Sequence, residues 1–557
     1  VAGTGNFLVS IRWDDYDITD DCRWTGDIVL KDTAILTMGK TITLAQNRTV
    51  AQTTRDAETG LFAGRTRWTC EAGSYLRQEN VSTIRLTEGS SLVFESGSRF
   101  VQAFDASMEV GAGCTLRFVD DADVMLRGIL EVDSGGVCYM TDTIGMGATA
   151  RIIVRPGGKL VVDGGMLTSV DSGGMWQGVE VWGHRNRHQT AADQGTLELR
   201  NGAVIENALC GVRTGRGSDS LHTTGGIVTA ENSTFRNCAK AVEFLPYTDT
   251  IANGLIASNH GGFTNCTFTV DDNNLFAAGN ASFTAHATLC QVKGVEFLGC
   301  TFLNLTSSPL YRGRAIYAQE AGFTVDEYCD YQQLPPAQPG VCGCPPEYSD
   351  SCLFEGFATA IDAGTAGTPF AVTVNRARFA NNSTSVRINA NNFATVTECD
   401  FDLTDCEPFG RLACGLNLDN CTGYKVEGNA FYRDSYPNPV FCTDNHTGVQ
   451  VTASGSAANS IYRNGFTNLT KGIAVSGSNG GLQIGCNGFT NNSYDIHIPA
   501  GASVAMSQGT LSAGADNVFE QTRVSSIYNA SGQKLIYRYS AGNGHAPYSP
   551  YNVMPDA

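Results

Sequence analysis

The chain has 557 residues, of which only 17 % are charged and 63 are glycine. This composition is typical of turn-rich all-β proteins. The formal charge of −18 repels nucleic acid and anionic membranes, so neither is an expected partner. The sequence contains no apolar stretch of about 18 residues, and we therefore expect no insertion into a membrane.

The cysteine content predicts the compartment. Nineteen cysteines are ordinary in an exported protein with disulfides and hazardous in a reducing cytosol. The chain opens at Val1 without the basic segment or apolar core of a signal peptide, which suits a processed form. The predicted location is secreted or at the cell surface.

Residues 1–25 do not share the repeat that follows, and we interpret them as an N-terminal cap over the first coil of a repeat protein. Their acidic run, WDDYD at 13–17, leaves two interpretations open. One is a structural calcium site, because carboxylates bind hard cations. The other is a solvated acidic turn, which we favour, and no other cofactor is predicted.

From residue 26 to 167, apolar residues alternate with polar ones between glycine-rich turns, as in TLRF at 115–118 and KLVV at 159–162. A period of two is the pattern of a β-strand. Residues 50–78 break the pattern and are interpreted as an insertion, which is either a loop or a second part of the cap.

The segment GGMWQGVEVWG at 173–183 is the most distinctive one. Alternation puts Val179 and Val181 inward and Glu180 and Trp182 outward. Trp182 is either free to stack on a sugar ring or covered by the loop that follows it, and we favour the covered state.

Phenylalanines mark a longer repeat between residues 228 and 525. Phe379, for example, has Val372 and Val374 before it and Val386 and Ile388 after it. Apolar pairs at i and i+2 share a face only in extended backbone. The frame recurs at Phe235, Phe268, Phe302, Phe354, Phe401, Phe431, Phe466, Phe489 and Phe519. Such self-similarity predicts a stack of coils, each of which buries its inward face against its neighbours.

The Gly-apolar-x-apolar units GLNL at 415–418, GVQV at 448–451 and GIAV at 472–475, together with the N-x-x-F units, resemble the right-handed parallel β-helix repeat. The resemblance implies an all-β solenoid over 26–525 as a single elongated domain. It is silent on function, because that family includes polysaccharide lyases, glycoside hydrolases, phage tailspikes and adhesins.

A second resemblance concerns the source of the protein. Segment 173–183 and the Asp-Thr/Ser-apolar triplets at 32–34, 142–144 and 219–221 resemble surface glycoproteins of the Bacteroidota exported by the type IX secretion system. The triplets would be the O-glycosylation acceptors of that group.

Further insertions are expected at 318–352, 402–415 and 432–448. The first holds four cysteines in a proline-rich run, which lacks paired C-x2-C zinc knuckles and is interpreted as a disulfide-stapled loop. Cysteines that precede a marker Phe by two residues, such as Cys300 and Cys399, form either disulfides between coils or a stack of buried thiols. The candidate disulfide cysteines are Cys329, Cys342, Cys344, Cys352, Cys406 and Cys414.

In the units of Phe302, Phe401 and Phe431 the next inward residue is delayed, to Ile316, Leu416 and Val449. The extra loops of these units should therefore leave the coil at the same turn and project from one edge. The candidate ligand-binding residues are Asp405, Glu407, Arg411, Tyr432, Arg433, Asp434, Tyr436, Asp444 and His446 on that edge, with Trp182 elsewhere. Aromatic rings with carboxylates and arginine suit glycan binding, two carboxylates could serve as acid and base, and a plain loop is the third alternative.

No catalytic set can be placed on the repeat. The motifs that polygalacturonase-like hydrolases carry on successive strands are absent or in the wrong order here, since Asn259-His260-Gly261 precedes Asp271-Asp272. We therefore predict a non-enzymatic cell-surface structural or adhesive protein, with itself (as a fibre) or surface glycans as partners. The alternatives are a polysaccharide lyase or glycoside hydrolase, and a glycan-binding module. Residues 526–557 lose the frame and are interpreted as a tail or docking segment.

Overall fold

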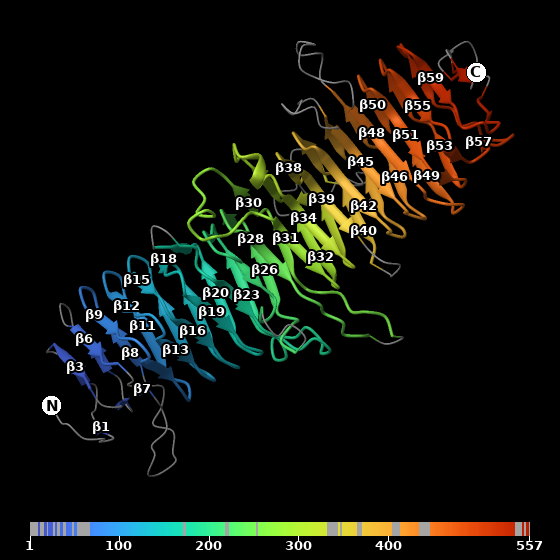
Figure 1. Cartoon of the computed structure of the whole chain (residues 1–557). Coiled ribbons are helices and arrows are strands. Elements are labelled where there is room, and N and C mark those ends of the chain that lie inside the picture. The colour runs from blue at the N-terminus through green and yellow to red at the C-terminus, as the bar shows by residue number, and fades with distance from the viewer. Residues whose placement is uncertain are drawn as a thin grey trace. The chain divides into compact units, whose positions relative to one another are not determined.

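A computed structural model of the chain describes residues 9–11, 16–18, 21–25, 28–30, 34–36, 41–46, 49–52, 67–170, 174–217, 222–251, 254–330, 344–345, 348–364, 370–403, 413–433, 446–540, 548–550 and 553–555. The chain divides into two compact units, Val1–His286 and Ala287–Ala557. Each unit is a parallel β-helix, in which successive coils contribute strands in turn to three sheets, A, B and C (Figure 1).

The described residues of unit 1 form ten coils. Its sheet A comprises β1 (Val9–Ile11), β4 (Ile28–Leu30), β7 (Thr49–Gln52), β10 (Thr83–Leu86), β13 (Ser107–Val110), β16 (Ile129–Val132), β19 (Arg151–Val154), β22 (Gly178–Val181), β25 (Val212–Arg213) and β28 (Lys240–Phe244). Its sheet B comprises β2 (Tyr16–Ile18), β5 (Ala34–Leu36), β8 (Arg67–Cys70), β11 (Ser91–Phe94), β14 (Thr115–Phe118), β17 (Val137–Met140), β20 (Lys159–Asp163), β23 (Thr196–Arg200), β26 (Ile227–Glu231) and β29 (Gly262–Thr264). Its sheet C comprises β3 (Cys22–Trp24), β6 (Thr41–Leu44), β9 (Tyr75–Gln78), β12 (Arg99–Gln102), β15 (Asp123–Leu126), β18 (Thr143–Met146), β21 (Met166–Ser169), β24 (Val204–Glu206), β27 (Thr234–Arg236) and β30 (Thr267–Val270).

β31 (Ala285–Cys290) spans the boundary between the units. In unit 2, sheet A comprises β34 (Arg314–Gln319), β39 (Thr359–Gly364), β42 (Thr384–Asn389), β45 (Ala413–Asp419), β48 (His446–Thr452), β51 (Lys471–Ser476), β55 (Tyr494–Ile498), β59 (Ser525–Asn529) and β61 (Met554–Pro555). Sheet B comprises β32 (Lys293–Leu298), β35 (Gly322–Asp326), β40 (Val372–Asn375), β43 (Thr395–Thr397), β46 (Lys425–Glu427), β49 (Asn459–Tyr462) and β53 (Leu482–Gly485). Sheet C comprises β33 (Thr301–Asn304), β38 (Leu353–Glu355), β41 (Arg378–Ala380), β44 (Asp400–Asp402), β47 (Ala430–Tyr432), β50 (Gly465–Thr467), β54 (Gly488–Thr490) and β58 (Val518–Glu520).

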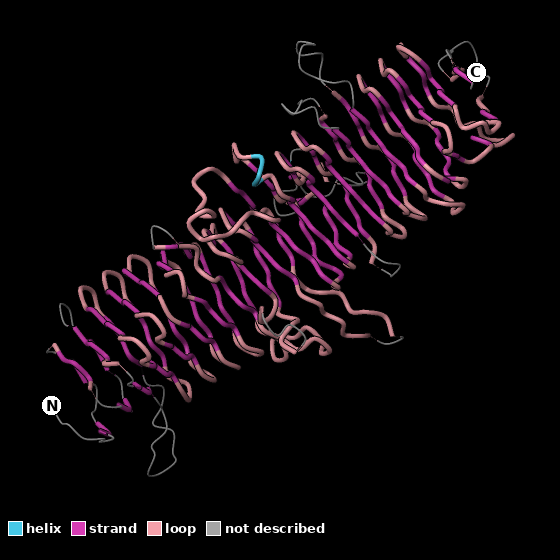
Figure 2. Tube along the Cα trace, viewed as in Figure 1, coloured by secondary structure: helices cyan, strands magenta, loops and turns pink. Residues whose placement is uncertain are grey.

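Several short elements lie in the connections between the coil strands of unit 2. They are η1 (Pro309–Tyr311), the antiparallel pair β36 (Tyr328–Cys329) and β37 (Ser349–Asp350), the pair β52 (Ser478–Asn479) and β56 (Ser503–Val504), and the pair β57 (Ser507–Gln508) and β60 (Ile536–Tyr537). Figure 2 shows that, apart from the short helical turn η1, the described chain consists of strands joined by loops and turns. Among the described residues, no helix has the length and apolar character needed to cross a bilayer.

The marker phenylalanines of unit 2 form one column along sheet C. Neighbouring rings lie 4.4–5.6 Å apart, with interplanar angles of 4–12°. The eight marker rings are at most 3 % exposed, namely Phe302, Phe354, Phe379, Phe401, Phe431, Phe466, Phe489 and Phe519. In unit 1, Phe235 and Phe268 stack in the same way at 4.9 Å. The predicted phase of the repeat is confirmed, because each marker points into the interior. Burial of each Phe stabilises the coil by about 1.5–3 kcal/mol.

A ladder of buried asparagines runs beside this column, at the turn between sheets B and C. The side-chain oxygen of Asn464 accepts from the backbone N–H of Asn429 at 3.0 Å, and Asn487 and Asn517 repeat the bond one coil further on, each at 2.9 Å. The Tyr537 hydroxyl ends the ladder, accepting from the Asn517 backbone at 3.0 Å. The ladder satisfies backbone donors that a tight buried turn would leave unpaired.

The first and last described strands pair with neighbouring coils. β1 to β3 pair in parallel with β4 to β6, so these three strands form a first coil, where the sequence suggested a separate cap. Near the other end, β61 extends sheet A beyond β59 and β60 pairs with β57. Strands of two or three residues carry too little pattern to be recognised, although a neighbouring coil suffices to hold them.

The insertions lie at two corners of the coil in unit 2. Those after β33, β44 and β47 all connect sheet C to sheet A, as the delayed inward residues predict. The cysteine-rich insertion connects β35 of sheet B to β38 of sheet C. Regular strands occupy part of two predicted insertions, β8 and β9 within 50–78 and β35 within 318–352.

Candidate functional site

The outward side of sheet A in unit 2, here called face A, carries polar and aromatic side chains. Strand register aligns one outward residue per coil in a single central row. The row reads Tyr317, Asp362, Arg387, Asn417, Gln450, Ala474, His497 and Tyr528. Eight strands spaced by about 4.8 Å give the row a length of about 34 Å.

A charged cluster occupies one end of face A. Arg387 donates to both carboxylate oxygens of Asp362, at 2.8 and 2.7 Å, and Arg314 donates to the same carboxylate at 2.7 Å. The Arg314 guanidinium also lies over the Tyr317 ring, 4.8 Å from its centroid. The hydrogen bond to Asp362 raises the pKa of Arg387. Two guanidiniums thus hold the buried Asp362, which keeps their planes fixed while Arg387 stays half-exposed.

Aromatic rings occupy the other end of face A. The His497 ring stacks on Tyr528 with centroids 4.7 Å apart, and Tyr494 meets both rings edge-on at 5.2 and 5.6 Å. Burial lowers the pKa of His497 to about 4, and the charge of Lys471 adds to the effect. The imidazole is therefore neutral near pH 7, and the three half-buried rings form an uncharged platform beside an ammonium group.

The predicted ligand-binding edge borders face A, since its two loops enter β45 and β48. Of its residues, Asp405, Glu407, Arg411, Asp434, Tyr436 and Asp444 lie outside the described part of the chain. Tyr432 is half-buried, while Arg433 and His446 are 5 % and 4 % exposed. Of the edge residues that the structure describes, Tyr432 at the root of the second loop is therefore the most accessible one.

Trp182 lies on the outward side of sheet A in unit 1, as alternation predicts, and is half-buried. Its indole N–H donates to Glu180 at 2.8 Å. The guanidiniums of Arg155 and Arg216 lie 5.0 and 6.0 Å from the ring centroid. Cation–π contacts therefore occupy the ring, which makes Trp182 a weaker platform for a sugar than the rings on face A.

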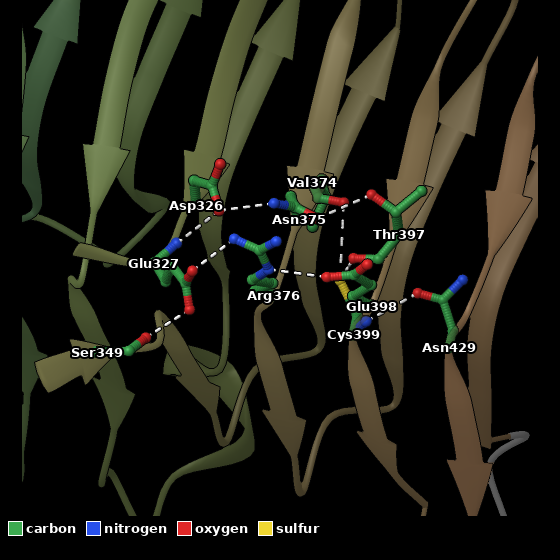
Figure 3. Close-up of polar contacts among 10 residues, drawn as sticks. All are labelled: Asp326, Glu327, Ser349, Val374, Asn375, Arg376, Thr397, Glu398, Cys399 and Asn429. Atoms are coloured by element: carbon green, nitrogen blue, oxygen red, sulfur yellow. Dashed lines mark hydrogen bonds and ion pairs between the residues drawn. The ribbon is translucent and has the colours of Figure 1, made fainter. Parts of the chain in front are cut away.

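A second polar region lies at the corner between sheets B and C of unit 2. In Figure 3, Arg376 donates to Glu327 at 2.5 Å through Nη1 and to Glu398 at 2.8 Å through Nε. The hydrogen bond to Glu398 raises the pKa of Arg376. Arg376 and Glu398 both have positive φ, 47° and 53°, because the same left-handed turn residue recurs on successive coils and points outward.

The corner opens into a cavity of about 280 Å³, which we call the corner pocket. Its lining residues are Glu327, Cys344, Ser349, Ser351, Arg376, Ala377, Arg378, Glu398 and Asp400. One residue earlier on each coil, Asn375 donates to Asp326 at 2.8 Å and accepts from Thr397 at 2.9 Å (Figure 3). A second polar row thus runs beside the first.

The disulfide Cys329–Cys344 staples the insertion at this corner, which confirms part of the cysteine prediction. Cys352 and Cys414 are thiols, so the prediction is wrong for them. Cys352 lies two residues before Phe354 and therefore points into the core, where it donates to the Phe297 carbonyl at 3.4 Å. Cys342 and Cys406 lie outside the described residues.

The cysteines that precede marker phenylalanines are buried thiols. Cys300 and Cys352 occupy facing positions on neighbouring coils, and the Cys300 backbone N–H lies 3.1 Å from the Cys352 sulfur. Cys399 is two coils from Cys352, with Ala377 between them. The buried-thiol alternative therefore holds for this column.

Sequence reasoning missed both face A and the corner pocket, although the Phe frame contained the signals. The residue eight positions after a marker Phe lies between two inward-facing residues and therefore points outward, which puts Arg387 on face A. Residues that lie three before a marker, such as Arg376 and Glu398, share one turn. Comparing the charges of residues at the same distance from each marker Phe would have shown that Arg376 and Glu398, of opposite charge, lie side by side on successive coils.

Across the described ranges, no group of three or more His, Cys, Asp or Glu side chains is arranged to hold a metal ion. The acidic run at 13–17 has no described side chains, so the calcium alternative stays a prediction.

No protein-family model matches the chain, and no curated protein matches it. Among solved structures, the chain is similar to a mutant tailspike protein of E. coli bacteriophage HK620 in complex with a pentasaccharide, with a TM-score of 0.31 and 13 % identity over 74 % of this chain and 72 % of that one. It is also similar to the PL6 family alginate lyase AlyGC, with a TM-score of 0.18 and 9 % identity over 94 % and 92 % of the two chains. Neither similarity is close enough to transfer an activity or a ligand.

Proposed function

We propose that this protein is an exported, non-enzymatic adhesive β-helix that binds an extended polysaccharide along face A of unit 2. The observation that carries the proposal is the central row, in which guanidinium, amide and aromatic groups recur along successive coils, interrupted by the buried Asp362 and Ala474. Planar donors and acceptors pair with sugar hydroxyls, and ring faces stack on the apolar faces of sugars.

The charge on face A favours binding over catalysis. Hydrolysis of a glycosidic bond needs one carboxyl group that can donate a proton and a second carboxylate that acts as base or nucleophile. Asp362, the carboxylate of the central row, is locked by Arg314 and Arg387, and its side chain is only 6 % exposed. Such a group orients its two arginines and offers little surface to a substrate.

The cysteine content and the disulfide support an extracellular location. Surface glycans are accordingly the partners we propose. Self-assembly into a fibre is a weaker candidate, because β61 of the chain itself already pairs with the sheet A edge at β59.

The test is affinity electrophoresis and calorimetry with neutral and acidic polysaccharides and with oligosaccharides of increasing length. We expect affinity to rise with oligosaccharide length, because the row offers contacts on successive coils. Arg387→Ala and Tyr528→Ala should each weaken binding about tenfold, or about 1.4 kcal/mol. Arg463→Ala is the matched control, because Arg463 lies at the turn between sheets B and C and should leave binding unchanged.

Two results would contradict the proposal. Equal affinity in all variants would remove face A as the site. Release of reducing ends or unsaturated sugars during incubation would show an enzyme, which is the alternative that the fold leaves open.

A further inference from the structure

We propose that the corner pocket is a second, separate binding site, which takes a single neutral sugar residue such as the terminal or branch residue of a glycan. It lies between sheets B and C of unit 2, whereas face A is the outward side of sheet A. The proposal does not depend on the function assigned to face A.

The first argument is rigidity. Glu327 accepts from Arg376 and from the Ser349 hydroxyl, and Arg376 in turn donates to Glu398. This chain of contacts joins three successive parts of the corner, namely the β36–β37 pair and the turns before β41 and β44. Its charges largely satisfy one another, so the chain forms a fixed wall and pre-organises the cavity.

The second argument is that charged groups remain available. Arg378 and Asp400 occupy facing positions on β41 and β44 and are both exposed. No described residue forms an ion pair with either side chain. The pocket therefore holds a guanidinium that can donate two parallel hydrogen bonds next to a carboxylate that can accept two. Adjacent hydroxyls of a sugar ring both donate and accept, so they suit this pair.

The third argument is the chemistry and size of the lining. Apart from Ala377 and Cys344, its members carry charges or hydroxyls, and none is aromatic. Three carboxylates against two guanidiniums disfavour an anionic ligand, and the lack of apolar wall disfavours a flat aromatic one. At about 280 Å³ the cavity is slightly smaller than typical ligand pockets, which span about 300–1,000 Å³. A single ring fits these limits better than a long chain does.

The experiment is saturation-transfer NMR, observed on a panel of neutral monosaccharides, uronic acids and free amino acids, with the intact oxidised protein. We expect at least one neutral monosaccharide to bind, and Arg378→Ala and Asp400→Asn each to lower its affinity at least tenfold. Both side chains are exposed, so unchanged thermal unfolding should accompany these losses. Arg463→Ala, at the same kind of turn outside the pocket, should bind as the wild type does.

The proposal is overturned if no neutral monosaccharide gives a signal up to high millimolar concentration, if both pocket variants bind normally, or if amino acids or uronic acids bind better. Arg387→Ala separates the two sites. This face A variant should keep monosaccharide binding in the pocket, whether or not it affects polysaccharide binding.

Discussion

Asp495 provides the sharpest test of the energetics of this β-helix. It lies in β55 and is 0 % exposed. Thr522 donates to one carboxylate oxygen at 2.5 Å and Asn492 to the other at 3.1 Å. Burial nevertheless raises the pKa of Asp495 from the ordinary 3.8 to about 7, because two neutral donors do not replace water around a full charge.

The size and sign of the effect follow from this pKa. A carboxyl pKa about three above its unfolded value favours the protonated folded form by about 4 kcal/mol. Since the folded pKa is raised, this stabilisation is complete below about pH 4 and is lost as the pH rises through about 7. Asp495→Asn stays neutral, and its amide N–H can donate to Thr522. The variant should therefore match the wild type near pH 4 and be more stable by up to about 4 kcal/mol at pH 8.

Local opening is the quantity to measure, because coils of a repeat protein can open without the rest. Hydrogen exchange of peptides that cover 494–498 and 525–529 compares the two proteins at each pH, so intrinsic exchange rates cancel. Glu520→Gln, an exposed neutral replacement on β58, controls for the loss of one charge. A difference that does not change between pH 4 and pH 8, or faster exchange in the variant at pH 8, would refute the argument.

Three further predictions concern the column, the ladder and the staple. Phe431→Ala should destabilise unit 2 by about 3–5 kcal/mol in urea unfolding, because it opens a cavity between stacked rings. The control Phe393→Ala, at a residue that is 71 % exposed, should change stability by less than about 0.5 kcal/mol. Equal effects of the two substitutions would contradict the stabilising role of the Phe column. Asn464→Ala should lower the free energy of unfolding by at least about 2 kcal/mol in the same assay, since it leaves several buried partners unpaired. An unchanged free energy of unfolding would show that the ladder does not stabilise the fold. Removing the disulfide with Cys329→Ser and Cys344→Ser should weaken monosaccharide binding in the corner pocket without lowering the thermal unfolding midpoint of the coils, and an unchanged affinity would show that the staple does not shape the pocket.

The repeat could be predicted from the sequence because its signal is local. An inward Phe and the aliphatic residues around it must recur at fixed spacing wherever extended backbone packs on a like neighbour, so Phe379 and Phe431 were identifiable as core. Insertions were visible for the same reason, as delays before Leu416 and Val449. The exact ends of the insertions were not, because strands as short as β1 and β36 gain their stability from pairing and carry little pattern of their own.

The sites depended on which residues become neighbours across coils. In the sequence, Arg387 is 25 residues from Asp362 and Arg376 is 49 from Glu327, and nothing local links them. Because turns differ in length, the number of residues per coil varies along the sequence. Which charges meet is therefore decided by the pairing of the strands. The sequence alone determined an inward column and its period. The tertiary structure decided which outward groups are locked in ion pairs and which remain available to a ligand, because that depends on register between strands that are distant in the chain.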